Sequence, residues 1–132
     1  MNNPRNHSLF PSDLCPSCFS GSGGAQTCPV CGYTPAGESD WNRLCPGTVL
    51  RERYAVGGAL GQGGFGVTYL GLDLLLHTRL AIKEYYPSGI CARNPESRSV
   101  RHASRDLEED FKKGMEKFLE EARTLARFED HP

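Results

Sequence analysis

The chain of 132 residues carries 15 basic and 16 acidic side chains, and its formal net charge is -1. This length allows one ordinary domain or two small ones, and the balanced charge argues against nucleic acid or an anionic membrane as a partner. The opening residues lack the basic start and apolar core of a signal peptide, and no apolar run reaches the roughly 18 residues of a membrane span. We therefore expect a cytoplasmic protein with no membrane segment in this chain.

Residues 1–40 are rich in glycine, proline, serine and cysteine, and they show neither helical nor strand periodicity. Such a segment buries too little apolar surface to fold without a cross-link or a bound metal. Four of the six cysteines form two Cys-x-x-Cys pairs in this segment. The sequence therefore predicts that cysteines stabilise this segment through a metal site or cross-links, and the candidate residues are Cys15, Cys18, Cys28 and Cys31.

Two such pairs can hold Zn²⁺ tetrahedrally through four thiolates. The alternatives are two disulfides, which suit a secreted chain, or a redox Cys-x-x-Cys, which needs a βαβ surrounding that this sequence lacks. Gly32 follows the last cysteine and permits a backbone conformation with positive φ. We predict a small structural zinc ribbon over residues 1–40, and we expect Cys45 and Cys91 to be free thiols.

Residues 41–53 are interpreted as a linker, and residues 54–86 are expected to be extended, with a turn near His77. Two strand-like stretches flank the glycine-rich LGQGGFGV of residues 60–67, and RLAIKEYY forms a third. Residues 87–106 contain two prolines and four arginines and are predicted to be a solvated polar loop.

The last segment is predicted to be a helix from Leu107 to about Phe128. Apolar residues recur there at steps of three or four, at Leu107, Phe111, Met115, Phe118, Ala122 and Leu125. Gly114 lowers helix stability and is interpreted as a break before the main helix. Together with the strands, this helix places the chain in the α+β class.

The glycine pattern alone fits a dinucleotide fold, a phosphate loop of a kinase, or a turn without a ligand. A dinucleotide fold requires a helix directly after the glycines, whereas VTYLGLD carries the β-branched and aromatic residues of a strand. Two strands around a glycine loop, followed by a third strand with a lysine, are the arrangement that covers ATP phosphates in protein kinases. Lys83 is the lysine in that position.

From about Thr48 onward the chain resembles the N-terminal lobe of a bacterial serine/threonine kinase of the eukaryotic type. The resemblance is carried by LGQGGFGVTYL, by AIKEYYP and by a glutamate-bearing helix that ends in EDHP. It implies that glycine N–H groups meet phosphate, that Phe65 closes over the site and that Lys83 holds the α- and β-phosphates. The ATP contacts that it implies are Leu60, Gly61, Gln62, Gly63, Gly64, Phe65, Gly66, Thr68, Ala81 and Lys83. Thr68 departs from the family, which usually has valine there.

The resemblance also implies a glutamate partner for Lys83. Five glutamates lie in the helix, and Glu121 alone sits at the edge of the apolar stripe, three residues after Phe118 and four before Leu125. The family motif, a glutamate before Ala-x-x-Leu, selects the same residue. We therefore predict Lys83 and Glu121 as the catalytic residues in this chain.

The chain stops at Pro132, before the catalytic loop and the Mg²⁺ ligands of the family. We expect the 132 residues to be inactive alone and the parent enzyme to transfer the γ-phosphate of ATP to serine or threonine of a protein that the sequence does not identify. The alternative is a non-catalytic pseudokinase or protein-interaction module. A nucleic-acid-binding ribbon is disfavoured, because residues 1–47 have Arg5 and Arg43 against Asp13, Glu38 and Asp40.

Overall fold

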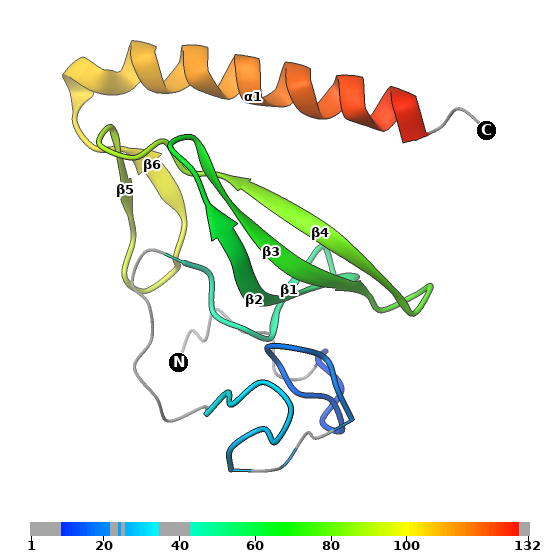
Figure 1. Ribbon diagram of the computed structural model, residues 1–132. Coiled ribbons are helices and arrows are strands. Elements are labelled where there is room, and N and C mark those ends of the chain that lie inside the picture. Colours follow the sequence, from blue (N-terminus) through cyan, green and yellow to red (C-terminus); the bar gives the residue numbers. More distant parts are fainter. Residues whose placement is uncertain (1–8, 22–23, 25, 35–42, 130–132) are drawn as a thin grey trace.

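The computed structural model describes residues 9–21, 24, 26–34 and 43–129, except for the side chains of 122–129. Its main sheet is antiparallel, with strand order β1-β2-β3-β4 (Figure 1). The strands are β1 (Thr48–Leu50), β2 (Tyr54–Gln62), β3 (Gly66–Asp73) and β4 (Thr78–Tyr85). A second sheet pairs β5 (Cys91–Arg93) with β6 (Val100–His102), and η1 (Arg105–Leu107) then leads into α1 (Glu108–Glu129). Antiparallel sheets followed by a helix are compatible with the predicted α+β class.

Several sequence predictions fall partly outside these residues. The predicted ribbon and linker include 1–8, 22–23, 25 and 35–42, the EDHP ending includes 130–132, and the apolar stripe includes the side chains of Ala122 and Leu125. The proposed boundaries after residues 40 and 53 stay predictions. Within the supposed linker, the structure places β1, which pairs with the start of β2 through Thr48 opposite Val56.

The register of the main sheet places the glycine-rich strand beside the lysine strand. Gly61 pairs with Thr68, and Thr68 pairs with Lys83, so the three residues lie in one line across β2, β3 and β4. Side chains alternate between the two faces of a strand. We call the face that carries Thr68 and Lys83 the Lys83 face, and the opposite face, with Val67 and Tyr69, the Tyr69 face.

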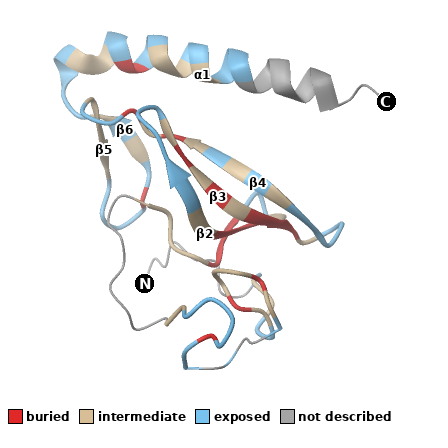
Figure 2. Cartoon of the chain, in the orientation of Figure 1, coloured by how far each residue is buried: buried red, intermediate tan, exposed pale blue. Residues whose placement is uncertain are grey.

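Each face has its own apolar cluster, and buried residues concentrate in β2 and β3 (Figure 2). On the Lys83 face, Leu72 and Ala55 pack with Phe19 from the cysteine-containing segment. On the Tyr69 face, Val56, Val67 and Tyr69 form the centre, and Ile82 and Tyr86 pack around them. Each face of the sheet thus has its own apolar cover, while Ala81 and Lys83 of β4 stay exposed on the Lys83 face.

Helix α1 packs on the Lys83 face at the loop end of the strands, while the cysteine-containing segment lies toward the other end (Figure 1). The ring of Tyr85 lies 5.1 Å from that of Phe111 and 5.4 Å from that of Phe118. The helix continues through Gly114 without interruption, so the predicted break is wrong. The predicted helix bounds agree with α1 to within one residue at each end.

The segment 87–106 is a folded hairpin on the Tyr69 face and not the solvated loop that we expected. The Arg93 side chain is 2% exposed and forms an ion pair with Glu84 of β4. Arg98 is also buried and donates a hydrogen bond to the carbonyl oxygen of Arg43. The polar composition misled the prediction because the partners of these arginines lie in other segments, Glu84 in β4 and Arg43 before β1.

Candidate functional site

The tip of the glycine-rich loop is a tight turn held by backbone hydrogen bonds. The N–H of Gly63 donates to the carbonyl of Gly66 at 2.9 Å. The carbonyls of Gly64 and Phe65 accept from the N–H groups of Ser88 and Tyr86, at 3.0 and 2.9 Å. Among the described residues, no backbone carbonyl accepts a turn or loop hydrogen bond from the N–H of Gly64 or of Phe65. These two donors at the tip are available to a ligand.

The loop glycines differ in whether steric packing or backbone conformation requires a residue without a side chain. A Cβ at Gly66 would collide with the carbonyl oxygen of Glu84, so packing alone requires glycine there. A Cβ at Gly61, Gly63 or Gly64 would meet nothing within 4 Å, and none of these three has a positive φ. Neither packing nor backbone conformation explains these three glycines.

A cavity of about 260 Å³ lies beneath this loop. The loop, β3, β4 and α1 all contribute lining residues, namely Gly63, Gly64, Phe65, Gly66, Val67, Thr68, Lys83, Glu84, Phe118 and Glu121. Lys83 and Glu121, which are 38 positions apart in the chain, thus line the same cavity, although among the described residues no ion pair joins them. A smaller neighbouring cavity of about 110 Å³ lies between the Phe65 tip and α1.

Four of the predicted ATP contacts do not line this cavity. Leu60 is 64% exposed, and Gly61, Gln62 and Ala81 are also exposed. Ala81 pairs with Leu70 and therefore shares the Lys83 face with Thr68. The ATP contacts of Leu60, Thr68 and Ala81 stay predictions.

Three residues that line the larger cavity were not predicted as site residues, namely Val67, Glu84 and Phe118. Phe118 lines both cavities, but its place in the apolar stripe assigned it only to the core. Glu84 accepts a hydrogen bond from the Tyr69 hydroxyl at 2.8 Å and pairs with Arg93. Alternation along β4 places Glu84 on the face opposite Lys83, and this signal was available in the sequence.

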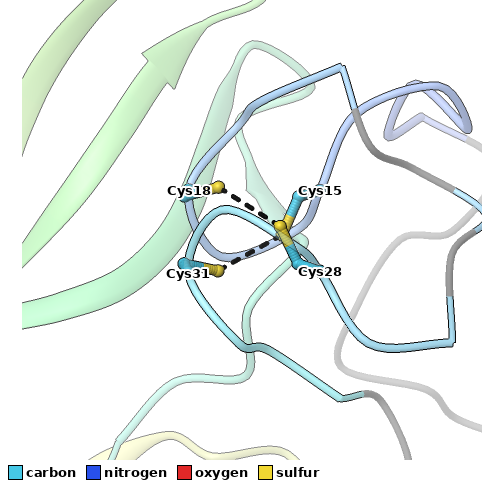
Figure 3. Close-up of side chains that lie close together, drawn as sticks. All are labelled: Cys15, Cys18, Cys28 and Cys31. Carbon is cyan, nitrogen blue, oxygen red and sulfur yellow. Dashed lines mark hydrogen bonds between the residues drawn. The ribbon is translucent and has the colours of Figure 1, made fainter.

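The four predicted metal ligands come together in the cysteine-containing segment (Figure 3). The Sγ atoms are 3.7 Å apart for Cys15 and Cys31 and 3.8 Å apart for Cys18 and Cys28, and all four lie within 4.8 Å of one another. A zinc ion about 2.3 Å from four tetrahedral sulfurs requires sulfur–sulfur distances of about 3.8 Å. The four cysteines therefore fit a tetrahedral ion such as Zn²⁺.

Two turns of the same geometry present these cysteines. In the first turn, the N–H of Cys15 donates to the carbonyl oxygen of Ser20, and the N–H of Phe19 donates to the carbonyl oxygen of Cys15. In the second turn, the N–H of Cys28 donates to the carbonyl oxygen of Tyr33, and the N–H of Gly32 donates to the carbonyl oxygen of Cys28. The residue after each pair has positive φ, 64° at Phe19 and 81° at Gly32. The prediction for Gly32 is confirmed, whereas Phe19 reaches this conformation without being glycine because its ring is buried against Ala55 and Leu72.

The surroundings favour the thiolate at two of the four cysteines, Cys18 and Cys28, whereas burial raises the pKa of Cys15 and raises that of Cys31 to about 12. Backbone hydrogen bonding, chiefly from Cys31, lowers the pKa of the Cys28 thiol to about 5. Hydrogen bonding to the Ser20 side chain lowers the pKa of Cys18. Metal ions bind the thiolate form of cysteine, so both effects favour metal binding at neutral pH.

The cysteine-containing segment is attached to the strand that leads into the glycine-rich loop. Gly58 N–H donates to the carbonyl oxygen of Ser17 at 2.8 Å. A Cβ at Gly57 would lie 2.6 Å from that oxygen and 2.9 Å from Cζ of Phe19. This close approach requires glycine at Gly57, and a Cβ at Gly58 would lie 2.6 Å from the hydroxyl oxygen of Ser17.

No helix among the described residues is long and apolar enough to cross a membrane.

No protein-family model and no curated protein matches the chain. Among solved structures, the chain is similar to PpkA-294 in its apo form, from a bacterial serine/threonine kinase, with a TM-score of 0.63 and 36% identity. The match covers 69% of this chain and 31% of that one, so this chain spans less than a third of the length of that structure. The likeness supports a kinase-related function at a coarse level.

Proposed function

We propose that the chain is the ATP-binding part of a serine/threonine protein kinase, preceded by a structural zinc site. The parent enzyme would transfer the γ-phosphate of ATP to serine or threonine of a protein substrate. The observation that carries this proposal is the cavity beneath the glycine-rich loop, which Lys83 of β4 and Glu121 of α1 both line. The likeness to PpkA-294 supports the same reading.

The chemistry of the cavity suits a polyphosphate. The N–H groups at the Gly64–Phe65 tip supply hydrogen-bond donors, and the Lys83 ammonium supplies positive charge. The open space around Gly61, Gly63 and Gly64 lets phosphate oxygens approach the backbone where a side chain would obstruct them. Glu121 would orient the ammonium, as the helix glutamate does in kinases.

The site would also need Mg²⁺, which bridges phosphate oxygens and offsets their charge in kinases. We expect its protein ligands to lie outside these 132 residues. The role of this part is thus to bind and orient the nucleotide, while transfer belongs to the parent protein. The four cysteines would hold Zn²⁺ and stabilise the segment that packs on β2.

The nucleotide site is tested by an NMR titration that measures the affinity of the 132-residue chain for ATP. Lys83→Ala and Gly63→Val should each weaken binding about tenfold or more, because a charge-assisted contact or access to the backbone is lost. Matched controls are Lys112→Ala, which removes an exposed ammonium of α1, and Gly21→Val, since Gly21 also has open space and no positive φ.

Unchanged affinity in both site variants, or no binding of ATP to the wild-type chain, would overturn the proposed nucleotide site. Phosphoryl transfer is tested separately on the parent protein with γ-labelled ATP. Label should appear on serine or threonine of a protein, and Lys83→Ala should abolish it.

A further inference from the structure

We infer that Tyr85 and Gly114 together form a joint that positions α1, and with it Glu121, at the cavity that Lys83 also lines. They are positioning residues, since neither lines the cavity that contains Lys83. The part of the inference that concerns ATP rests on the proposed function. The joint between β4 and α1 does not depend on whether ATP binds.

Tyr85 ends β4 and stands two residues after Lys83, so both side chains project from the Lys83 face. Its side chain is buried, and its hydroxyl donates a hydrogen bond of 2.8 Å to the carbonyl oxygen of Phe111 in α1. Burial raises the pKa of the Tyr85 hydroxyl, which therefore keeps its donor proton at neutral pH. A helix carbonyl has a second lone pair, so it can accept this bond in addition to its helical one.

Gly114 makes the close approach possible. A methyl group at this position would overlap the Tyr85 hydroxyl oxygen and would lie 3.3 Å from Cζ of the same ring. Glycine in the middle of a helix is otherwise unfavourable compared with alanine. The contact with Tyr85 gives a structural reason for glycine at this place.

The joint is connected to the cavity through one turn of the helix. The Tyr85 ring contacts Phe111 and Phe118, on either side of Gly114 in the helix sequence. Phe118 lines the cavity together with Glu121, three residues further along α1, and its ring would lie 3.4 Å from a Cβ on Gly66. A shift of α1 away from Tyr85 would therefore move Phe118 and Glu121 relative to both Lys83 and the glycine-rich loop.

The test compares four proteins, namely the wild-type chain, Tyr85→Phe, Gly114→Ala and the double variant. Gly114→Ala should shift the backbone amide resonances of Lys83, Gly66 and Glu121. It should also lower ATP affinity at least about threefold, because a methyl group that pushes against Tyr85 displaces α1 from the cavity. Tyr85→Phe removes the oxygen that the new methyl would meet. The double variant should return both the resonances and the affinity to those of Tyr85→Phe.

Rescue separates positioning from a general effect on the helix. If only helix propensity mattered, Gly114→Ala would stabilise α1 and would leave the cavity resonances unchanged, and this result would overturn the inference. Lys113→Ala is the control, because it changes the exposed neighbouring side chain and should leave cavity resonances and affinity as they are.

Two further outcomes are decisive. If Gly114→Ala fails to fold, recovery of the fold in the double variant supports the joint, and failure of the double variant refutes it. If the wild-type chain binds no ATP, the proposed function fails, but the shifts at Lys83 and Glu121 and their rescue still decide whether the joint positions the helix.

Discussion

Arg93 and Glu84 form a buried ion pair in which Nη2 of Arg93 lies 2.7 Å from Oε1 of Glu84. A second nitrogen of the same guanidinium donates to Oε2 at 2.9 Å, so the contact is bidentate. The pair connects β5 to β4, and Glu84 is the direct neighbour of Lys83. The hairpin is therefore fastened to the strand that carries the lysine.

Loss of one partner of this pair should destabilise the chain strongly. Arg93→Ala leaves a carboxylate and the Tyr69 hydroxyl in a largely buried place, and we expect a loss of about 3 kcal/mol in the free energy of unfolding by urea. Arg101→Ala, on the exposed side of β6, should change it by less than about 0.5 kcal/mol. The combined variant Arg93→Met with Glu84→Gln should lose less than Arg93→Ala does. An equal loss would show that the charge pair is not the cause.

Metal analysis of the reduced chain should find one zinc ion per molecule. Cys15→Ser should abolish stoichiometric zinc and unfold the cysteine-containing segment, because structural zinc contributes on the order of 10 kcal/mol to such folds. Cys91→Ser should keep the metal, since Cys91 lies in β5 and outside the cluster. Two disulfides with no metal would contradict the prediction, and thiol titration under denaturing conditions distinguishes them.

The cysteine-containing segment should stabilise the sheet through Phe19. Phe19→Ala empties the space between Ala55 and Leu72 and should cost about 3 kcal/mol in the free energy of unfolding, with zinc still bound. Val30→Ala in the same segment is the control, because Val30 is 68% exposed and should cost less than about 0.5 kcal/mol. Equal stability of Phe19→Ala and the wild type would show that the two parts fold independently.

The ion pair between Arg53 and Asp73 should make stability depend on pH in the acid range. Hydrogen bonding from Arg53 lowers the pKa of Asp73 to about 2, below the unfolded value of about 3.9. The contribution of the carboxylate is therefore complete above about pH 4 and is lost as the pH falls toward 2. The difference in unfolding free energy between wild type and Asp73→Asn should shrink over that interval. A difference that is constant with pH would contradict the assigned pKa.

The features that the sequence predicted correctly depend on neighbouring residues. The strands around the glycines and the ends of α1 follow from apolar spacing along a few turns or pleats. The cysteine cluster follows from two short loops of equal length. Glu121 was selected at the edge of the apolar stripe and lines the same cavity as Lys83, while its catalytic role stays a prediction.

The features that were missed depend on contacts between different secondary-structure elements. Strands β5 and β6 have three residues each, too few for a periodic pattern. Arg93 can be buried because it forms an ion pair with Glu84 of β4. Gly114 was read as a weak point, since nothing local indicates that a tyrosine 29 positions earlier approaches its Cα. The linker prediction missed β1 because its three residues are extended only through pairing with β2.

The bonds that Tyr86 and Ser88 make to the tip of the glycine-rich loop affect its conformational entropy. They fix the carbonyls of Phe65 and Gly64 in the absence of any ligand, although a run of glycines would otherwise be very mobile. A binding partner of this loop thus meets amide groups that are already oriented, and less of its binding free energy is spent on ordering them. Preorganisation of the loop is in this way supplied by the backbone that directly follows β4.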